Sequence, residues 1–328
     1  GYWGDHQIIY LQKLLELSQQ FHPDRLGNLL RQPIFSYANV PYKIKPFEAL
    51  LRDAKSTVVY DKLQAQRIEE RVAELGADGK LVLKANNRVY QVNLLEKLLV
   101  PLLAKLGNLV VEGGIWLNTQ RPEWNDANNA LVGQGLSMVT LYYLRRHLAF
   151  LRELLARESA TFELSREVSQ WLSDSAQALA GLRNSLGAAP LDAGQRYQAL
   201  ADLGEAASRY RHSVYEQEFF TGFIVQDPAL VRTMLDDALL AIDHSIRANR
   251  REDGLYHAYN LLEIDGSSAA VDTLYPMLEG QVAALSSGVI GPQETVELLQ
   301  TLFDSDLFRS DQSTFLLYPD RELPGFLT

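Results

Sequence analysis

The amino-acid sequence predicts a largely helical fold, in which pairs of amphipathic helices surround a shared core and loops at one end carry the function. Three observations support this prediction. Apolar residues recur mostly at steps of three and four along much of the chain. Extended segments are few and short. Candidate strands also never alternate with helices in the rhythm that a parallel sheet requires.

The clearest helix follows Gly135, where apolar side chains recur at helical spacing as far as Leu155. Charged side chains such as Arg145 and Glu153 fall largely on the opposite face. Breakers such as Gly291-Pro292 separate many of the helical segments. Comparable patterns predict helices over Ile8–Phe21, Lys62–Leu75, Leu94–Leu106, Ser165–Leu182, Leu230–Ile246, Met277–Leu285 and Glu294–Phe303.

Three places along the chain predict extended structure. Thr57–Tyr60 is a short candidate strand. Lys80–Lys84 and Arg88–Val92 flank Ala85-Asn86-Asn87, and this pattern is typical of a small hairpin. The third candidate is Leu255–Ile264.

Composition places the chain among soluble globular proteins. Its 328 residues are 47% hydrophobic and 22% charged, a length that fits two domains or one large helical unit. The net charge of −10, without a basic run, argues against nucleic-acid and anionic-membrane partners. The absence of cysteine excludes disulfides and thiolate sites. Charged residues interrupt every apolar stretch before the ~18–20 residues that a membrane span needs.

The segment from Glu112 to Asn129 is the most unusual part of the chain. It combines two tryptophans with three acidic residues, five amides and an arginine. Polar groups beside aromatic faces suit carbohydrate, which presents apolar C–H faces together with many hydroxyls. Alternatively, the tryptophans anchor the loop on the core while Asp126 and the asparagines cap the following helix. The candidate sugar contacts here are Arg121, Glu123, Trp124 and Asn125.

Three further concentrations of polar and aromatic residues are candidates for sugar contacts. Each has a structural alternative: a helix N-cap in the first, a glycine turn before a partly buried strand in the second, and a helix stop at Gly288 in the third. The residues concerned are Trp3, Asp5 and His6; Tyr256 and His257; and Glu279, Gln281, Ser286 and Ser287.

Other chemistries lack their motifs. The six histidines form neither a His-Glu-x-x-His nor a His-x-His pattern, so the sequence predicts no metal site. The chain has no nucleophile elbow, no phosphate-binding P-loop and no dinucleotide fingerprint. We therefore expect no metal or organic cofactor.

The run Gly113-Gly114-Ile115, Glu123-Trp124-Asn125-Asp126, Asn128 and Gly133-Gln134-Gly135 resembles a family motif. It is similar to the Asp-Trp-Asn-Asp-Gly-Met-Asn segment of glycoside hydrolase family 94, the cellobiose and chitobiose phosphorylases. The related β-1,3-glucan phosphorylases look similar. The other three concentrations resemble further segments of this family and fall in the family's order.

The resemblance implies a fold. The family has an (α/α)6 barrel behind an N-terminal β-sandwich, so residues 1–328 would form one all-α catalytic barrel. The small hairpin would lie in an insertion at about residues 56–95. Because the chain begins with Gly1 and not with methionine, we expect it to be part of a longer polypeptide. A homodimer is a further expectation.

The resemblance also implies site roles. Asp126 matches the family's general acid, and Asp5 matches the acidic residue that holds the sugar in the glycone subsite. Inorganic phosphate would be the nucleophile and co-substrate. Asp126 would have to stay protonated near neutral pH, which requires a partly desolvated pocket with Trp124 as a candidate wall.

The chain departs from the family at several positions. The arginine before the first segment is absent, Leu255 stands near the family's glutamate, and the C-terminal Thr-Gly-Thr phosphate loop has no counterpart. A phosphate site needs arginine, histidine or backbone N–H donors that converge on one point. The candidates are Arg121, His257, Ser286 and Ser287.

The primary functional prediction is an inverting glycoside phosphorylase that cleaves a β-linked gluco-oligosaccharide, with Asp126 as the acid. The alternative is an inverting hydrolase, with Glu279 or, second, Glu216 as the base, roughly 6.5–9.5 Å from the acid. A second alternative is a carbohydrate-binding barrel without catalysis. Phosphorolysis would favour a cytoplasmic location, where the sugar phosphate is retained.

Overall fold

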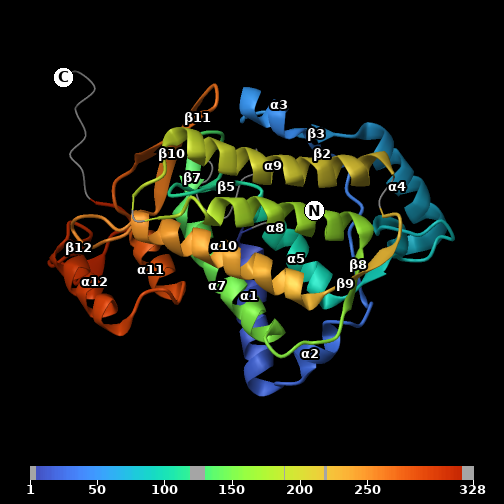
Figure 1. Cartoon of the computed structure of the whole chain (residues 1–328), viewed down its shortest axis with the longest axis horizontal. Helices are drawn as coiled ribbons and strands as arrows, with labels where there is room; N and C mark the ends of the chain where they lie inside the picture. Colours follow the sequence, from blue (N-terminus) through green and yellow to red (C-terminus); the bar gives the residue numbers. More distant parts are fainter. Residues whose placement is uncertain (1–4, 119–129, 188, 218–219, 320–328) are drawn as a thin grey trace.

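The computed structural model describes residues 5–118, 130–187, 189–217 and 220–319, with residues 5–7 described by their backbone. The fold is mixed α/β, with 54% of the described residues in helices and 16% in strands. A five-stranded, curled antiparallel sheet lies among the long helices (Figure 1). The prediction of an all-α (α/α)6 barrel is therefore wrong.

The sheet has the strand order β11-β10-β7-β6-β5, and its neighbours pair antiparallel. Strands β5, β6 and β7 are two or three residues long and buried throughout. Apolar and polar residues alternate along a strand only when one face of the sheet is exposed to water. These buried strands therefore lack the alternation from which a strand is predicted. The strands are β5 (Leu109–Val110), β6 (Gly114–Trp116), β7 (Gly135–Ser137), β10 (Tyr259–Asp265) and β11 (Ser268–Thr273).

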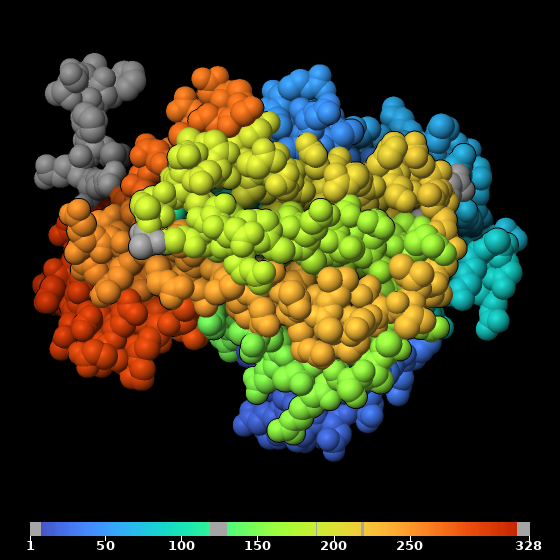
Figure 2. Space-filling view, viewed as in Figure 1, coloured from blue at the N-terminus to red at the C-terminus, as the bar shows by residue number. Residues whose placement is uncertain are grey.

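Long helices form the body of the molecule beside the sheet. Helices α8, α9 and α10 lie side by side on one face, where their side chains form a continuous surface (Figures 1 and 2). Each helix predicted from apolar periodicity is present, with bounds that shift by a few residues at most. The helices are α1 (Asp5–Phe21), α2 (Arg25–Leu29), α5 (Leu94–Leu106), α7 (Met138–Leu155), α8 (Arg166–Arg183), α9 (Ala193–Glu216), α10 (Pro228–Ala248), α11 (Leu278–Ser286) and α12 (Pro292–Asp304).

Apolar periodicity does not predict α9, the helix of 24 residues that follows Asp192. Most residues on its buried face are small, with alanines and Gly204 among them, and these give a weak apolar signal. Small side chains let the helix approach its neighbours closely. A Cβ built on Gly204 would lie 2.4 Å from the ring of Phe47. The sequence does mark its start, where Asp192 and Gln195 form a capping box.

Between α2 and α5 the chain forms short strands and the helices α3 and α4, and α4 lies at the right in Figure 1. The predicted hairpin is confirmed, because Lys84 N–H donates to Arg88 O at 2.8 Å and Tyr90 N–H donates to Val82 O at 2.9 Å. The elements are β1 (Phe35–Ser36), β2 (Tyr42–Ile44), α3 (Phe47–Arg52), β3 (Val58–Tyr60), α4 (Lys62–Leu75) and β4 (Gln91–Val92); the later strands are β8 (Phe162–Ser165), β9 (Phe223–Gln226), β12 (Phe308–Arg309) and β13 (Thr314–Phe315).

A buried carboxylate joins this region to the helical body. Glu96, in the first turn of α5, is fully buried. Its Oε1 accepts hydrogen bonds from the Tyr37 hydroxyl at 2.9 Å and from Ser165 Oγ at 2.7 Å, and its Oε2 accepts one from Ser165 N–H at 2.7 Å. Burial raises the pKa of the Glu96 carboxyl. One side chain thus ties three segments of the chain together.

The raised pKa of Glu96 predicts a pH dependence of stability. The folded protein holds this proton more tightly than the unfolded chain, so the contribution of Glu96 to the free energy of unfolding is largest below pH 4.5 and declines as pH rises through the raised pKa. We expect wild type to lose stability relative to Glu96→Gln as pH rises. Urea unfolding of both proteins from pH 4 to 8 measures this, and a difference that moves the other way would contradict it.

The contact between Gly204 and Phe47 predicts opposite effects for two glycine substitutions. Gly204→Ala should lower the free energy of unfolding by about 1–3 kcal/mol, because the new methyl group overpacks against the ring. Gly181→Ala, in α8, should raise it by about 0.5–1 kcal/mol, because nothing lies within 4 Å of the new Cβ and alanine favours the helix. Thermal and urea unfolding measure both. Equal effects would refute the packing explanation.

Candidate functional site

The centre of the predicted site lies outside the described residues. This applies to Asp126, the predicted acid, and to Arg121, Glu123, Trp124 and Asn125 beside it. Trp3 also lies outside them. Asp5 and His6 are the first residues of α1, and their side chains are not described. The roles predicted for these residues stay predictions.

The residues that flank the segment 119–129, Leu117 and Gly133–Gly135, are nevertheless fixed on the sheet, and they form the base of this segment. Leu117 N–H donates to Gly135 O at 2.9 Å, and Gly133 N–H donates to Leu117 O at 2.7 Å. The indole Nε1 of Trp116 donates to Gly133 O at 3.1 Å. Trp116 itself is 4% exposed and belongs to the core. One of the two tryptophans in this stretch is therefore an anchor, and residues on both sides of the segment 119–129 are held by rigid strands.

The structure also bears on the alternative role of Asp126, as a cap for the long helix that follows. That helix is α7, and its N-cap is Ser137. The Ser137 hydroxyl accepts a hydrogen bond from Thr140 N–H at 3.0 Å. The long helix therefore does not depend on Asp126 for its cap.

The structure brings Tyr256 and Gln281, two of the candidate sugar contacts, together in a buried contact. Gln281 is fully buried, and its Oε1 accepts from Tyr256 N–H at 2.8 Å. Its Nε2 donates to Tyr256 O at 2.7 Å and to Met277 O at 2.9 Å. The Tyr256 hydroxyl donates to Glu294 at 2.6 Å. Gln281 thus joins the first turn of α11 to the chain that leads into β10, and its amide is engaged with backbone.

His257 lies beside this contact and is held at two points. Its Nδ1 donates to Leu274 O at 3.1 Å, and its backbone carbonyl accepts from the Tyr142 hydroxyl at 3.0 Å. Burial, followed by the nearby Arg251 charge, lowers the pKa of His257. Because a carbonyl can only accept, Nδ1 carries the proton in the neutral ring and Nε2 is an acceptor. An anion such as phosphate would need the protonated ring.

Ser286 and Ser287 lie at the end of α11, and Gly288 follows with φ of 74°. The Ser287 hydroxyl donates to Ala284 O at 2.6 Å, and its carbonyl accepts from Arg145 Nη1 at 3.1 Å. The alternative of a helix stop is confirmed here. Phosphate binding by these two serines stays a prediction.

The two candidate bases lie in different places. Glu279 is in the first turn of α11, close in sequence to Gln281. Glu216 is the last residue of α9, where it pairs with His212 at 3.1 Å. Both partners are largely exposed. Glu216 is thus at the far end of the helix from Arg196, which contacts the sheet.

Strand register places two of the predicted contacts relative to the base of the segment 119–129. Leu261 of β10 lies opposite Gly135, at that base, and Tyr259 lies opposite Ser137. Tyr256 and His257 precede β10 in the chain, on the side of Tyr259 and Ser137. The sequence order of the motifs did not reveal this arrangement.

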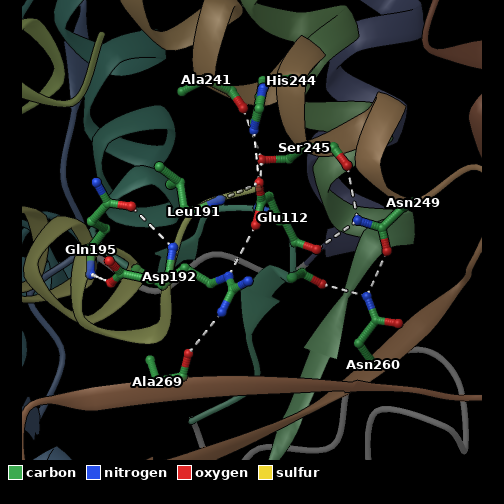
Figure 3. Close-up of polar contacts among 12 residues, drawn as sticks. Glu112, Leu191, Asp192, Gln195, Ala241, His244, Ser245, Asn249, Asn260 and Ala269 are labelled. Atoms are coloured by element: carbon green, nitrogen blue, oxygen red, sulfur yellow. Dashed lines mark hydrogen bonds and ion pairs between the residues drawn. The ribbon is translucent and has the colours of Figure 1, made fainter. Parts of the chain in front are cut away.

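The described residues contain a further polar cluster, which the sequence analysis did not single out (Figure 3). It is centred on the carboxylate of Glu112, which is 7% exposed. Its Oε1 accepts from Leu191 N–H and from His244 Nε2, both at 2.9 Å, and its Oε2 accepts from Arg196 Nε at 3.1 Å. These donors come from the start of α9 and from α10, so the carboxylate joins both helices to the turn between β5 and β6.

The backbone of the same turn is held as well. Glu112 N–H donates to Ser245 Oγ at 2.9 Å, and Glu112 O accepts from Asn249 Nδ2 at 2.7 Å. Asn260 Nδ2 donates to Gly113 O at 2.8 Å and to Asn249 Oδ1 at 2.7 Å. The partners are scattered over distant parts of the sequence, so no local motif could predict the cluster. The Glu112-Gly113-Gly114 turn was the available signal.

The comparisons with known proteins leave the family open. No protein-family model matches the chain, and no curated protein matches it. Within the described ranges, no group of three or more histidines and carboxylates is placed to hold a metal ion. No helix in that part of the chain is both long enough and apolar enough to cross a membrane.

The environment of His257 predicts its protonation state. Because burial and Arg251 lower its pKa, we expect the ring to titrate with a midpoint below 6.5 and to be neutral at pH 7.5. Two-dimensional NMR of the histidine side chains across pH 4 to 8 measures this, with His257→Gln to assign the signal. A midpoint at or above 6.5 would contradict the expectation and would make His257 a better anion ligand.

Proposed function

We propose that the chain is an inverting glycoside phosphorylase that acts on a β-linked gluco-oligosaccharide. The Asp126 carboxyl gives its proton to the oxygen of the leaving sugar. An oxygen of inorganic phosphate attacks the anomeric carbon from the opposite face of the ring, and the glycosidic bond breaks. The products are an α-linked sugar 1-phosphate and the shortened saccharide.

The observation that supports this proposal is the composition of the segment 119–129 together with the fixed position of the residues that flank it. Its composition of acid, amide and tryptophan suits a sugar, and its base is fixed by Trp116, Leu117 and Gly133 on a buried sheet. Because Ser137 caps α7, a structural need for Asp126 at that helix end is removed. The first point supports a sugar site in this segment, and the second means that α7 does not need Asp126 as its cap.

Phosphorolysis requires one fewer carboxyl group from the protein than hydrolysis does. A hydrolase needs a second carboxylate to activate water, about 6.5–9.5 Å from the acid. Glu216 is exposed and paired with His212 at the end of α9. Glu279 lies in the first turn of α11, two residues before Gln281. A phosphorylase needs one protein carboxyl, because phosphate is itself the nucleophile. A cytoplasmic location would follow from the need to retain the phosphorylated product.

The test is the activity of wild type and Asp126→Asn on β-linked gluco-oligosaccharides, with and without phosphate. We expect wild type to release sugar 1-phosphate in proportion to added phosphate. Asp126→Asn should lower kcat by at least 10³-fold, because the amide cannot donate the proton, while its thermal midpoint stays close to that of wild type. Asp304→Asn, at an exposed position in α12, is the matched control and should be fully active.

The other outcomes separate the alternatives. Reducing sugar formed at the same rate without phosphate would replace phosphorolysis by hydrolysis. Saccharide binding without turnover, unchanged in Asp126→Asn, would indicate a non-catalytic carbohydrate-binding protein. Turnover that survives Asp126→Asn would refute the assignment of the acid.

A further inference from the structure

Strand β6 links the Glu112 cluster to the base of the segment 119–129. At its start, the turn of Glu112 and Gly113 is held by side chains from α10 and β10. At its end, Trp116 and Leu117 bind Gly133 and Gly135. The three residues between, Gly114–Trp116, pair with β5 on one side and β7 on the other. A displacement of the turn would therefore also displace Leu117 and its partners Gly133 and Gly135 at the base.

The turn also has little freedom to move towards its neighbours. A Cβ on Gly113 would lie 2.6 Å from Leu136 Cδ1, and one on Gly114 would lie 2.9 Å from the backbone of Ser137. Because the backbone of this turn is so closely packed, a displacement of the turn is transmitted to the neighbouring strands.

The residue at this turn is unusual for its backbone. Glu112 has φ of 62°, in the left-handed region that favours glycine or asparagine. A glutamate there needs an explanation beyond the shape of the turn. Its carboxylate supplies one, since it accepts from Leu191, His244 and Arg196 while nearly excluded from water.

We infer that Glu112 is a positioning residue. Its carboxylate fixes the β5–β6 turn against α9 and α10, and through β6 it fixes the base of the segment 119–129. The effect on the base stands on the described contacts alone. The consequence for catalysis rests on the proposed function.

Two substitutions separate the side chain from the backbone conformation. Glu112→Gln keeps the size of the side chain but loses its charge. It also replaces one of the two acceptor oxygens by an amide N–H₂ group, which cannot accept a hydrogen bond from the donors there. Glu112→Gly removes the carboxylate and adopts the left-handed φ without strain. The control is Glu16→Gln, which removes the charge from another carboxylate–arginine pair, with Arg146, at a more exposed position on α1.

Hydrogen exchange measured by mass spectrometry is the first readout, under conditions where each variant is folded. We expect peptides that contain Leu117 and Gly133–Gly135 to exchange at least tenfold faster in Glu112→Gln and in Glu112→Gly. Peptides from α5 and α8 should change less than twofold, and Glu16→Gln should leave the base unchanged. A wild-type rate at the base in Glu112→Gly, or equal acceleration throughout the chain, would overturn the inference.

Arg196→Lys covers the case in which neither Glu112 variant folds. It keeps the charge beside Glu112 but loses the planar guanidinium fork, so the same peptides should exchange faster by a smaller factor. An unchanged rate at the base would overturn the inference.

Activity gives the second readout. If wild type forms sugar 1-phosphate, Glu112→Gln should lower kcat at least tenfold with KM within about twofold, and Glu16→Gln should change neither. Faster exchange with unchanged kcat would refute the catalytic consequence. If wild type has no such activity, the proposed function fails while the exchange result still decides whether Glu112 positions the base.

Discussion

The arrangement of the sheet and of helices α9 and α10 depends on the buried carboxylate of Glu112. A carboxylate loses several kcal/mol of hydration when it is buried, and it is stable there only if donors replace the water. At Glu112 the replacement donors come from residues 191–196 and from α10. All hydrogen bonds to this carboxylate form only when the start of α9 and α10 are both packed against the sheet.

The same principle operates at the other end of α5. Glu96 lies in its first turn and is bound by Tyr37 and Ser165, whereas the chain after α5 runs through β5 to Glu112. The helix between the two carboxylates is leucine-rich and almost entirely buried. Apolar burial supplies the cohesion of this centre, and the two buried acids specify which segments pack against it.

The sequence predicted the long helices well, because a leucine-rich face repeats at helical spacing whatever the helix packs against. Lys62–Leu75 and Leu94–Leu106 have the predicted bounds. It failed for α9, whose buried face is mostly small residues, and for the central sheet, whose short buried strands show no alternation. The candidate site stays a prediction, because Asp126 and its neighbours lie outside the described residues. The contact between Tyr256 and Gln281 joins residues far apart in sequence, so only the structure reveals it.

By itself the sequence determined much of the local structure of this protein: where the leucine-rich helices begin and end, where the hairpin turns, and which segment concentrates polar and aromatic groups. These features depend on neighbouring residues along the chain. The tertiary structure decided that the core includes a sheet, that Trp116 is an anchor, and that Glu112 meets Arg196 and His244. Those contacts join residues far apart in sequence, and the cost of burying charge and backbone polar groups selects them when the segments pack.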